Sequence, residues 1–229
     1  LPVTSTVQAV QGVTYPALSQ IADDKAKFTD GYLRILRLLS FAIFPVMLGF
    51  VAIADDMFLL LLGQRWMPTV PYFEILSLSG LFYPLAVVSY NVLKARSDGR
   101  VILRLEVVKR VIMTAVLAIT IPMSVKAVAW GVTAMAAIEF VLNTAAALRY
   151  LSNTVSSILR AICPSLLLAL MMFALLLFVA PYLSPLHVAW RLILEIFVGS
   201  VIYFLFAWLY RVKAFSEGLM LLRELIKKR

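Results

Sequence analysis

Long apolar runs alternate with short polar segments along this chain. A helix needs roughly 20 residues to cross about 30 Å of hydrocarbon, and most of the runs reach or approach that length with few charges inside. Because backbone polar groups in lipid must be satisfied within the segment, the pattern predicts an all-α integral membrane protein with six spanning helices. The six runs cover about residues 34–54, 68–93, 105–123, 127–148, 161–182 and 190–210.

The first 21 residues differ from the spans because polar side chains recur on them at helical spacing. Gln8 and Gln11 belong to this stripe, together with Thr4 and Tyr15. The segment is predicted to form a partial N-terminal helix. Two interpretations fit it: a wall beside a watery cavity, where Gln8 and Gln11 contact substrate, or a helix at the membrane interface.

The last 19 residues predict a C-terminal amphipathic helix. Phe215, Leu219, Leu222 and Ile226 share one face, and charged residues lie away from it. Such a helix suits the surface of an anionic membrane. A solvated tail is the alternative interpretation.

The composition agrees with a membrane protein and narrows its partners. The chain is 63% hydrophobic and 14% charged, whereas soluble domains are about 45–50% apolar and 25% charged. The net charge of +9 arises from residues between the spans, which favours anionic membrane lipids over nucleic acid as partners. Cys163 and His187 are each the only residue of their type. We therefore expect no intrachain disulfide, metal site or cofactor.

Lysine and arginine fall on alternate sides of the spans. Eighteen of the 21 lie before the first span, in every second loop, or after the last span. By the positive-inside rule, these segments and the C-terminus are predicted to face the cytoplasm. The opposite side carries only three basic residues, Arg65, Lys126 and Arg191.

Charged residues in the third run are candidates for a binding site. The stretch from Val111 to Pro122 has only 12 residues, about 18 Å of helix, so the preceding charged turns must enter the membrane if this segment spans. Glu106 stands at i,i+3 and i,i+4 to Lys109 and Arg110, and all three can share one side. They either line a cavity mouth that binds an anionic head group, or snorkel to lipid phosphates with Glu106 as a local partner.

A carboxylate near mid-bilayer forms a second candidate. Glu139 lies 12 residues into the fourth run, and Asn143 follows one turn later. Such a group must face protein or water, or be protonated. It either binds a proton, a cation or substrate, or makes an interhelical hydrogen bond. Glu195, one turn after Arg191, is predicted to form a structural ion pair with it.

The usual signatures of enzymes are absent from the sequence. It contains no Walker A loop, no G-x-S-x-G, no H-E-x-x-H and no paired cysteine motif. We therefore expect a protein without covalent chemistry.

One part of the chain resembles a known family. The stretch from about residue 10 to 100 is similar to the second half of Wzx-type polysaccharide (O-antigen or exopolysaccharide) flippases, of the multidrug/oligosaccharidyl-lipid/polysaccharide exporter superfamily. The motifs that carry the resemblance are Tyr15-Pro16-Ala17-Leu18-Ser19, Asp23-Asp24, Gly31-Tyr32-Leu33-Arg34, Phe44-Pro45 and Leu60-Leu61-Leu62-Gly63-Gln64-Arg65-Trp66.

The resemblance implies a MATE-like transporter fold of 14 helices in two lobes. Residues 1–151 would be part of the second lobe, and 152–229 the final transmembrane helix pair with its cytoplasmic amphipathic tail. The chain, which starts at Leu1, is then expected to be the C-terminal part of a longer protein whose N-terminal lobe is a partner. The family moves polyprenyl-pyrophosphate-linked oligosaccharide across the bacterial inner membrane by alternating access. No motif transfers a binding residue.

Two other functions are compatible with parts of the pattern. A cation-coupled multidrug exporter of the same fold is favoured if Glu139 is a coupling site. A membrane-embedded polysaccharide polymerase would need a large non-cytoplasmic loop with catalytic residues, and the loops at 123–126 and 184–189 are short.

Overall fold

The computed structural model describes residues 14–16, 18–21, 23–152 and 155–227, with side chains up to residue 220. Within these ranges all regular structure is helical, so the predicted all-α fold is confirmed. The elements are α2 (Lys25–Ala52), α3 (Ala54–Leu61), η1 (Gln64–Thr69), α4 (Val70–Arg96), α5 (Gly99–Thr120), α6 (Val125–Ala147), η2 (Leu148–Tyr150), α7 (Val155–Leu183), α8 (Val188–Leu209) and α9 (Lys213–Lys227).

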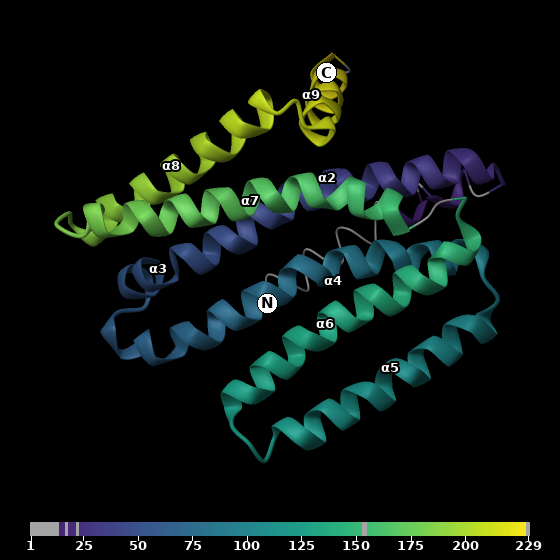
Figure 1. Cartoon of the computed structure of the whole chain (residues 1–229), viewed down its shortest axis with the longest axis horizontal. Coiled ribbons are helices and arrows are strands. Elements are labelled where there is room, and N and C mark those ends of the chain that lie inside the picture. Colours follow the sequence, from purple (N-terminus) through teal and green to yellow (C-terminus); the bar gives the residue numbers. More distant parts are fainter. Residues whose placement is uncertain (1–13, 17, 22, 153–154, 228–229) are drawn as a thin grey trace.

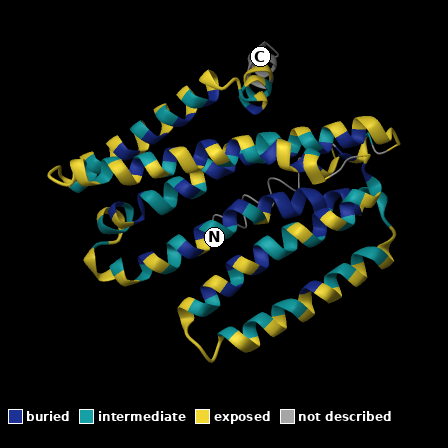
Figure 2. Ribbon diagram, viewed as in Figure 1, coloured by how far each residue is buried: buried dark blue, intermediate teal, exposed yellow. Residues whose placement is uncertain are grey.

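The helices form two groups that meet along α2 and α4 (Figure 1). In one group α7 packs on α2, α8 packs on α7, and α9 returns to α2. In the other, α4 packs on α6, and α5 lies outside α6. Burial is greatest where the two groups meet and least at the outside: α4 is dark blue over much of its length in Figure 2, whereas α5 is mostly intermediate or exposed. The best-covered parts of the chain therefore lie between α2, α4, α6 and α7.

Five helical segments are long and apolar enough to cross a membrane, and they contain five of the six predicted spans. The sixth, α5, is one continuous helix of 22 residues, about 33 Å long at 1.5 Å per residue. It therefore has the necessary length only because the charged turns around Glu106 and Arg110 are part of it. Its crossing of the membrane remains a prediction.

Local sequence signals set several helix boundaries. The Asp24 carboxylate caps α2 by accepting hydrogen bonds from the amides of Ala26 and Lys27, each at 3.1 Å. These bonds, led by that from the Lys27 backbone, hold the pKa of Asp24 below its ordinary value. Gly63, with φ of 82°, makes the turn from α3 into η1, in a backbone region that favours glycine.

The seam between the two groups depends on a residue without a side chain. At Gly80 of α4, a Cβ atom would meet the thioether of Met47 in α2. The sulfur of Met47 therefore packs directly on the backbone of the opposite helix. On the other side of α2, within its own group, the Tyr203 hydroxyl of α8 donates to the Phe41 carbonyl at 2.8 Å.

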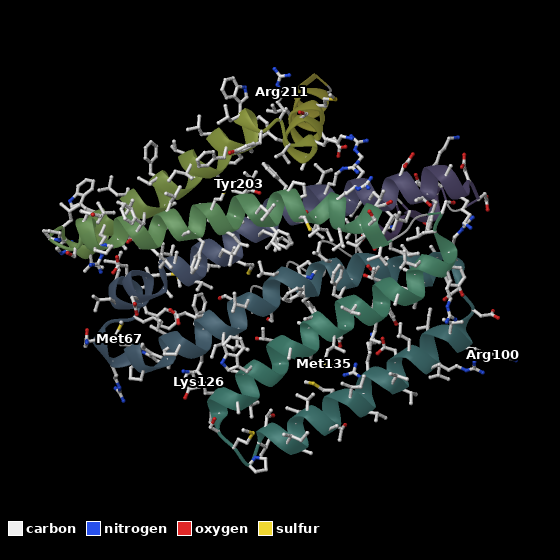
Figure 3. All side chains as sticks on the ribbon, viewed as in Figure 1. Met67, Arg100, Lys126, Met135, Tyr203 and Arg211 are labelled. Atoms are coloured by element: carbon white, nitrogen blue, oxygen red, sulfur yellow. The ribbon has the colours of Figure 1, made fainter. Side chains whose placement is uncertain are left out.

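The ends of the helices separate by charge. The start of α2, the α4–α5 turn and the α6–α7 connection lie at one end of the molecule, here called the basic-rich end (Figure 1). Arg100 lies at this end in Figure 3, whereas Met67 and Lys126 lie towards the other, basic-poor end. The alternation in the sequence therefore corresponds to two sides in space. Which side faces the cytoplasm remains a prediction.

Candidate functional site

Lys109 anchors α5 to the rest of the bundle. It is the one described side chain of α5 that is buried, with 6% of its surface exposed. Its ammonium lies 2.5 Å from the Glu106 carboxylate and 4.9 Å from the ring centroid of Tyr90 in α4. A buried cation requires such compensation, and an aromatic face supplies part of it. Lys109 thus points towards α4.

Two further cations surround this pair. Arg110 lies 3.8 Å from Glu106, and its side chain is 80% exposed. The Lys94 ammonium also lies 4.9 Å from the Tyr90 centroid. The Glu106 carboxylate therefore pairs with two cations while a third lies on the Tyr90 ring, so a net positive charge remains near the basic-rich end. Because Arg110 is exposed, its pair with Glu106 is weak, and the guanidinium can turn towards an anionic group.

Asn143 and Glu139 lie on α6 in different surroundings. Asn143 is buried and donates from Nδ2 to the Ala86 carbonyl of α4 at 3.0 Å. Its Oδ1 has no hydrogen-bond partner among the described residues. Glu139 is half-buried, and no ion pair or hydrogen bond joins it to another described residue. Asn143 therefore links helices, whereas the Glu139 carboxylate has no polar partner within the described part of the chain.

A chain of buried hydroxyls joins α2, α4 and α6. The Tyr32 and Ser89 hydroxyls lie 2.9 Å apart, as do those of Ser89 and Thr144. Nearby, Asn91 donates to the Thr14 hydroxyl at 2.7 Å. Sequence analysis did not predict this network, although a serine and an asparagine two residues apart in an apolar run were an available signal. Its role is interhelical packing by hydrogen bonds.

An ion pair at the basic-poor end corrects one prediction. Arg191 of α8 was expected to pair with Glu195, but it binds Asp56 of α3 through two nitrogens, and Asp56 is 4% exposed. Glu195 is also buried, and its Oε2 has no partner among the described residues. The expected i,i+4 pair was displaced because α3 packs against α8 and brings a better-placed carboxylate.

Gln8 and Gln11 lie outside the described residues. In the part of the chain that the structure describes, no three His, Cys, Asp or Glu side chains are grouped closely enough to hold a metal ion. The structure thus brings Glu106, Lys109 and Arg110 together, whereas Glu139 and Asn143 lie on α6 and form no hydrogen bond or ion pair with them among the described residues.

Comparison with known proteins finds similarity to membrane and polysaccharide biosynthesis proteins. Residues 1–71 match a family described as "Polysaccharide biosynthesis protein". An uncharacterized membrane protein in the cps region of Klebsiella pneumoniae is 28% identical over 94% of this chain and 45% of its own length. The teichuronic acid biosynthesis protein TuaB of Bacillus subtilis is 25% identical over 43% of this chain and 21% of its own.

A third relative is named as a Wzx protein, the type that the sequence resembles. The lipopolysaccharide biosynthesis protein WzxC of Escherichia coli is 27% identical over 38% of this chain and 18% of its own length. The chain is therefore similar to a Wzx-type protein over part of its length. It spans less than half the length of these curated relatives. No solved structure matches it.

The matches do not cover all parts of the candidate site equally. The family match contains α2, α3 and therefore Asp56, but it ends before α5 and α6. Only the longer alignment to the Klebsiella protein extends over nearly the whole chain. Asp56, one partner of the ion pair at the basic-poor end, thus lies within the family match, whereas Glu106, Lys109 and Arg110 lie beyond it.

Proposed function

We propose that this chain is part of a transporter that moves polyprenyl-pyrophosphate-linked oligosaccharide across the bacterial inner membrane by alternating access. The observation that carries the proposal is the cationic group near the basic-rich end of α4 and α5, in a relative of Wzx-type proteins. The step requires no covalent chemistry, so the protein is proposed not to be an enzyme. Its C-terminus faces the cytoplasm, and a missing N-terminal lobe completes the cavity.

The geometry supports different roles for the two cations of α5. Arg110 is exposed and can bind a pyrophosphate oxygen directly. Lys109 is held against Tyr90 and Glu106, and it contributes charge from within the wall. Each charge-assisted contact with a phosphate is worth roughly 1.5–3 kcal/mol. Anionic lipids of the same leaflet bind the remaining basic turns.

Transport in vesicles tests the proposal. The full-length protein, reconstituted in proteoliposomes, should move a fluorescent lipid-linked oligosaccharide, and the double variant Lys109→Gln/Arg110→Gln should lose most of this activity. Arg104→Gln is the matched control, because it removes an exposed cation of the same helix that has no ion pair among the described residues. Translocation by the double variant at the wild-type rate, with normal insertion, would rule out this site.

The Glu139 carboxylate, which has no partner among the described residues, favours a second candidate, a cation-coupled multidrug exporter. A half-buried carboxylate without a partner in the described bundle can bind a proton or a small cation. In that case Glu139→Gln should abolish drug efflux that depends on an ion gradient. Glu74→Gln, at a half-buried carboxylate of α4, serves as the control. Unchanged efflux in the Glu139 variant would exclude the coupling role.

A further inference from the structure

A pocket of about 580 Å³ opens between α2, α7 and the turn from α8 into α9. Four cationic side chains line it, from three separate parts of the sequence: Arg37, Arg160, Arg211 and Lys213. Figure 3 shows Arg211 at the α8–α9 turn, far from Arg100 on α5. The pocket is thus separate from the α5 site, because α7 and α4 lie between them in Figure 1.

The charges around the pocket are only partly compensated. Arg37 has a partner, since its Nη2 lies 2.8 Å from the Glu217 carboxylate of α9. Among the described side chains, none forms an ion pair with Arg160, Arg211 or Lys213. The first turn of α9 begins at Lys213, and the positive end of its helix dipole adds to the field. The pocket therefore attracts an anion.

The backbone of Arg211 gives independent support for a role of its side chain. Its φ is 48°, in the left-handed region. The amides of Arg211 and Val212 donate to the carbonyls of Trp208 and Ala207, each at 3.1 Å. Such turns usually carry glycine at this position, and other L residues are strained there. The turn nevertheless holds an arginine whose side chain lines the pocket.

An apolar wall continues from the cations into the membrane region. Leu167 and Met171 of α7 line the same pocket and are exposed. From Arg160 to Met171 the distance along α7 is about 16 Å, towards the middle of a candidate span. A soluble anion would leave this wall uncovered, and a neutral lipid would leave the cations uncompensated. The ligand that covers both is an anionic amphiphile.

We propose that this pocket binds one anionic glycerophospholipid from the leaflet at the basic-rich end. Its phosphate lies among Arg160, Arg211 and Lys213, and an acyl chain follows Leu167 and Met171. The volume is within the range of about 300–1,000 Å³ that is usual for small-molecule sites. The lipid bridges α7 to the α8–α9 turn and thereby fixes the position of α9. This site does not depend on the transported substrate.

Lipid titration of the purified full-length protein tests the proposal. In a zwitterionic detergent, phosphatidylglycerol should raise the melting temperature saturably, and native mass spectrometry should detect one tightly retained lipid. Arg211→Gly should weaken this binding about tenfold, as expected for one charge-assisted contact, while the turn keeps its favoured residue. The triple variant Arg160→Gln/Arg211→Gly/Lys213→Gln should lose the response.

The controls separate the possible sources of a phosphate. Arg100→Gln removes an exposed cation at the same end outside the pocket and should respond like the wild type. An equal rise with phosphatidylcholine, or with soluble glycerol 3-phosphate, would overturn the proposal. It would also be overturned if Arg211→Gly bound phosphatidylglycerol as tightly as the wild type, or if polyprenyl pyrophosphate displaced the lipid at lower concentration. If the triple variant does not fold, Arg211→Gly alone decides.

Discussion

Two ion pairs among the described residues have a buried partner, and they are built in opposite ways. Asp56 and Arg191 are 135 residues apart and join α3 to α8 at the basic-poor end. Glu106 and Lys109 are three residues apart in α5. In the first pair the carboxylate is the better covered partner, and in the second it is the ammonium.

This difference in burial indicates which residue is left uncompensated when its partner is removed. Removing Arg191 leaves the buried Asp56 without compensation, and no other described cation forms an ion pair with it. Removing Glu106 leaves Lys109 over the Tyr90 ring, on a long side chain that can move. A long-range pair also joins two elements, whereas a pair within one helix does not. The first pair should therefore contribute more to stability.

The largest effect is expected for Arg191→Gln. Loss of one partner of a buried pair costs about 3–5 kcal/mol, because the other charge stays buried and uncompensated. The free energy of unfolding, measured by steric trapping in bicelles, should fall by this amount. The double variant Asp56→Asn/Arg191→Gln is the control and should recover part of the loss. A double variant as unstable as the sum of the two single variants would contradict the proposed coupling.

A smaller loss is expected for Glu106→Gln. Sequence reasoning predicts only about 0.2–0.5 kcal/mol, the usual contribution of an exposed helical pair. Since Lys109 is buried, we expect a loss of roughly 1–3 kcal/mol, typical of an unsatisfied buried polar group. Lys109→Met/Glu106→Gln should be more stable than the single change. Equal stability of Glu106→Gln and the wild type would indicate that Tyr90 alone compensates Lys109.

Glu217→Gln separates the effect of sequence distance from that of burial. Its pair with Arg37 joins residues 180 positions apart, but both side chains are partly exposed. If burial determines how much an ion pair stabilises the protein, the loss of unfolding free energy should be only about 0.2–1 kcal/mol and should shrink further at high salt. Thermal unfolding at two salt concentrations measures it. A loss as large as that of Arg191→Gln would show that distance along the chain matters more.

The smallest effect is expected at Asp24, whose contacts are local and exposed. Its pKa is lowered in the folded protein from an ordinary 3.8, first by the hydrogen bond from the Lys27 amide. The carboxylate therefore adds stability above pH 3.8 that is lost as the pH falls through the lower folded value. Asp24→Asn should remove this acid dependence while it keeps a capping side chain. An unchanged acid profile would assign the dependence to other groups.

The fold was largely predictable because its signals are local. Apolar runs, basic turns and the i,i+3 spacing of Glu106 and Lys109 can each be read within one segment. The sequence could not show that Lys109 is buried and Arg110 exposed, because this depends on how α4 places Tyr90 beside α5. Nor could it show the pair between Asp56 and Arg191. There a local rule favoured Glu195, and tertiary packing brought a competing carboxylate.

The contact of Met47 with Gly80 makes the seam between the two helix groups sensitive to oxidation. Conversion of the thioether to a sulfoxide adds a polar oxygen where the glycine leaves no room for even one additional carbon atom. Peroxide treatment should therefore lower the melting temperature of the wild-type protein and spare Met47→Leu. A single sulfur atom thus makes the packing of α2 against α4 sensitive to oxidants.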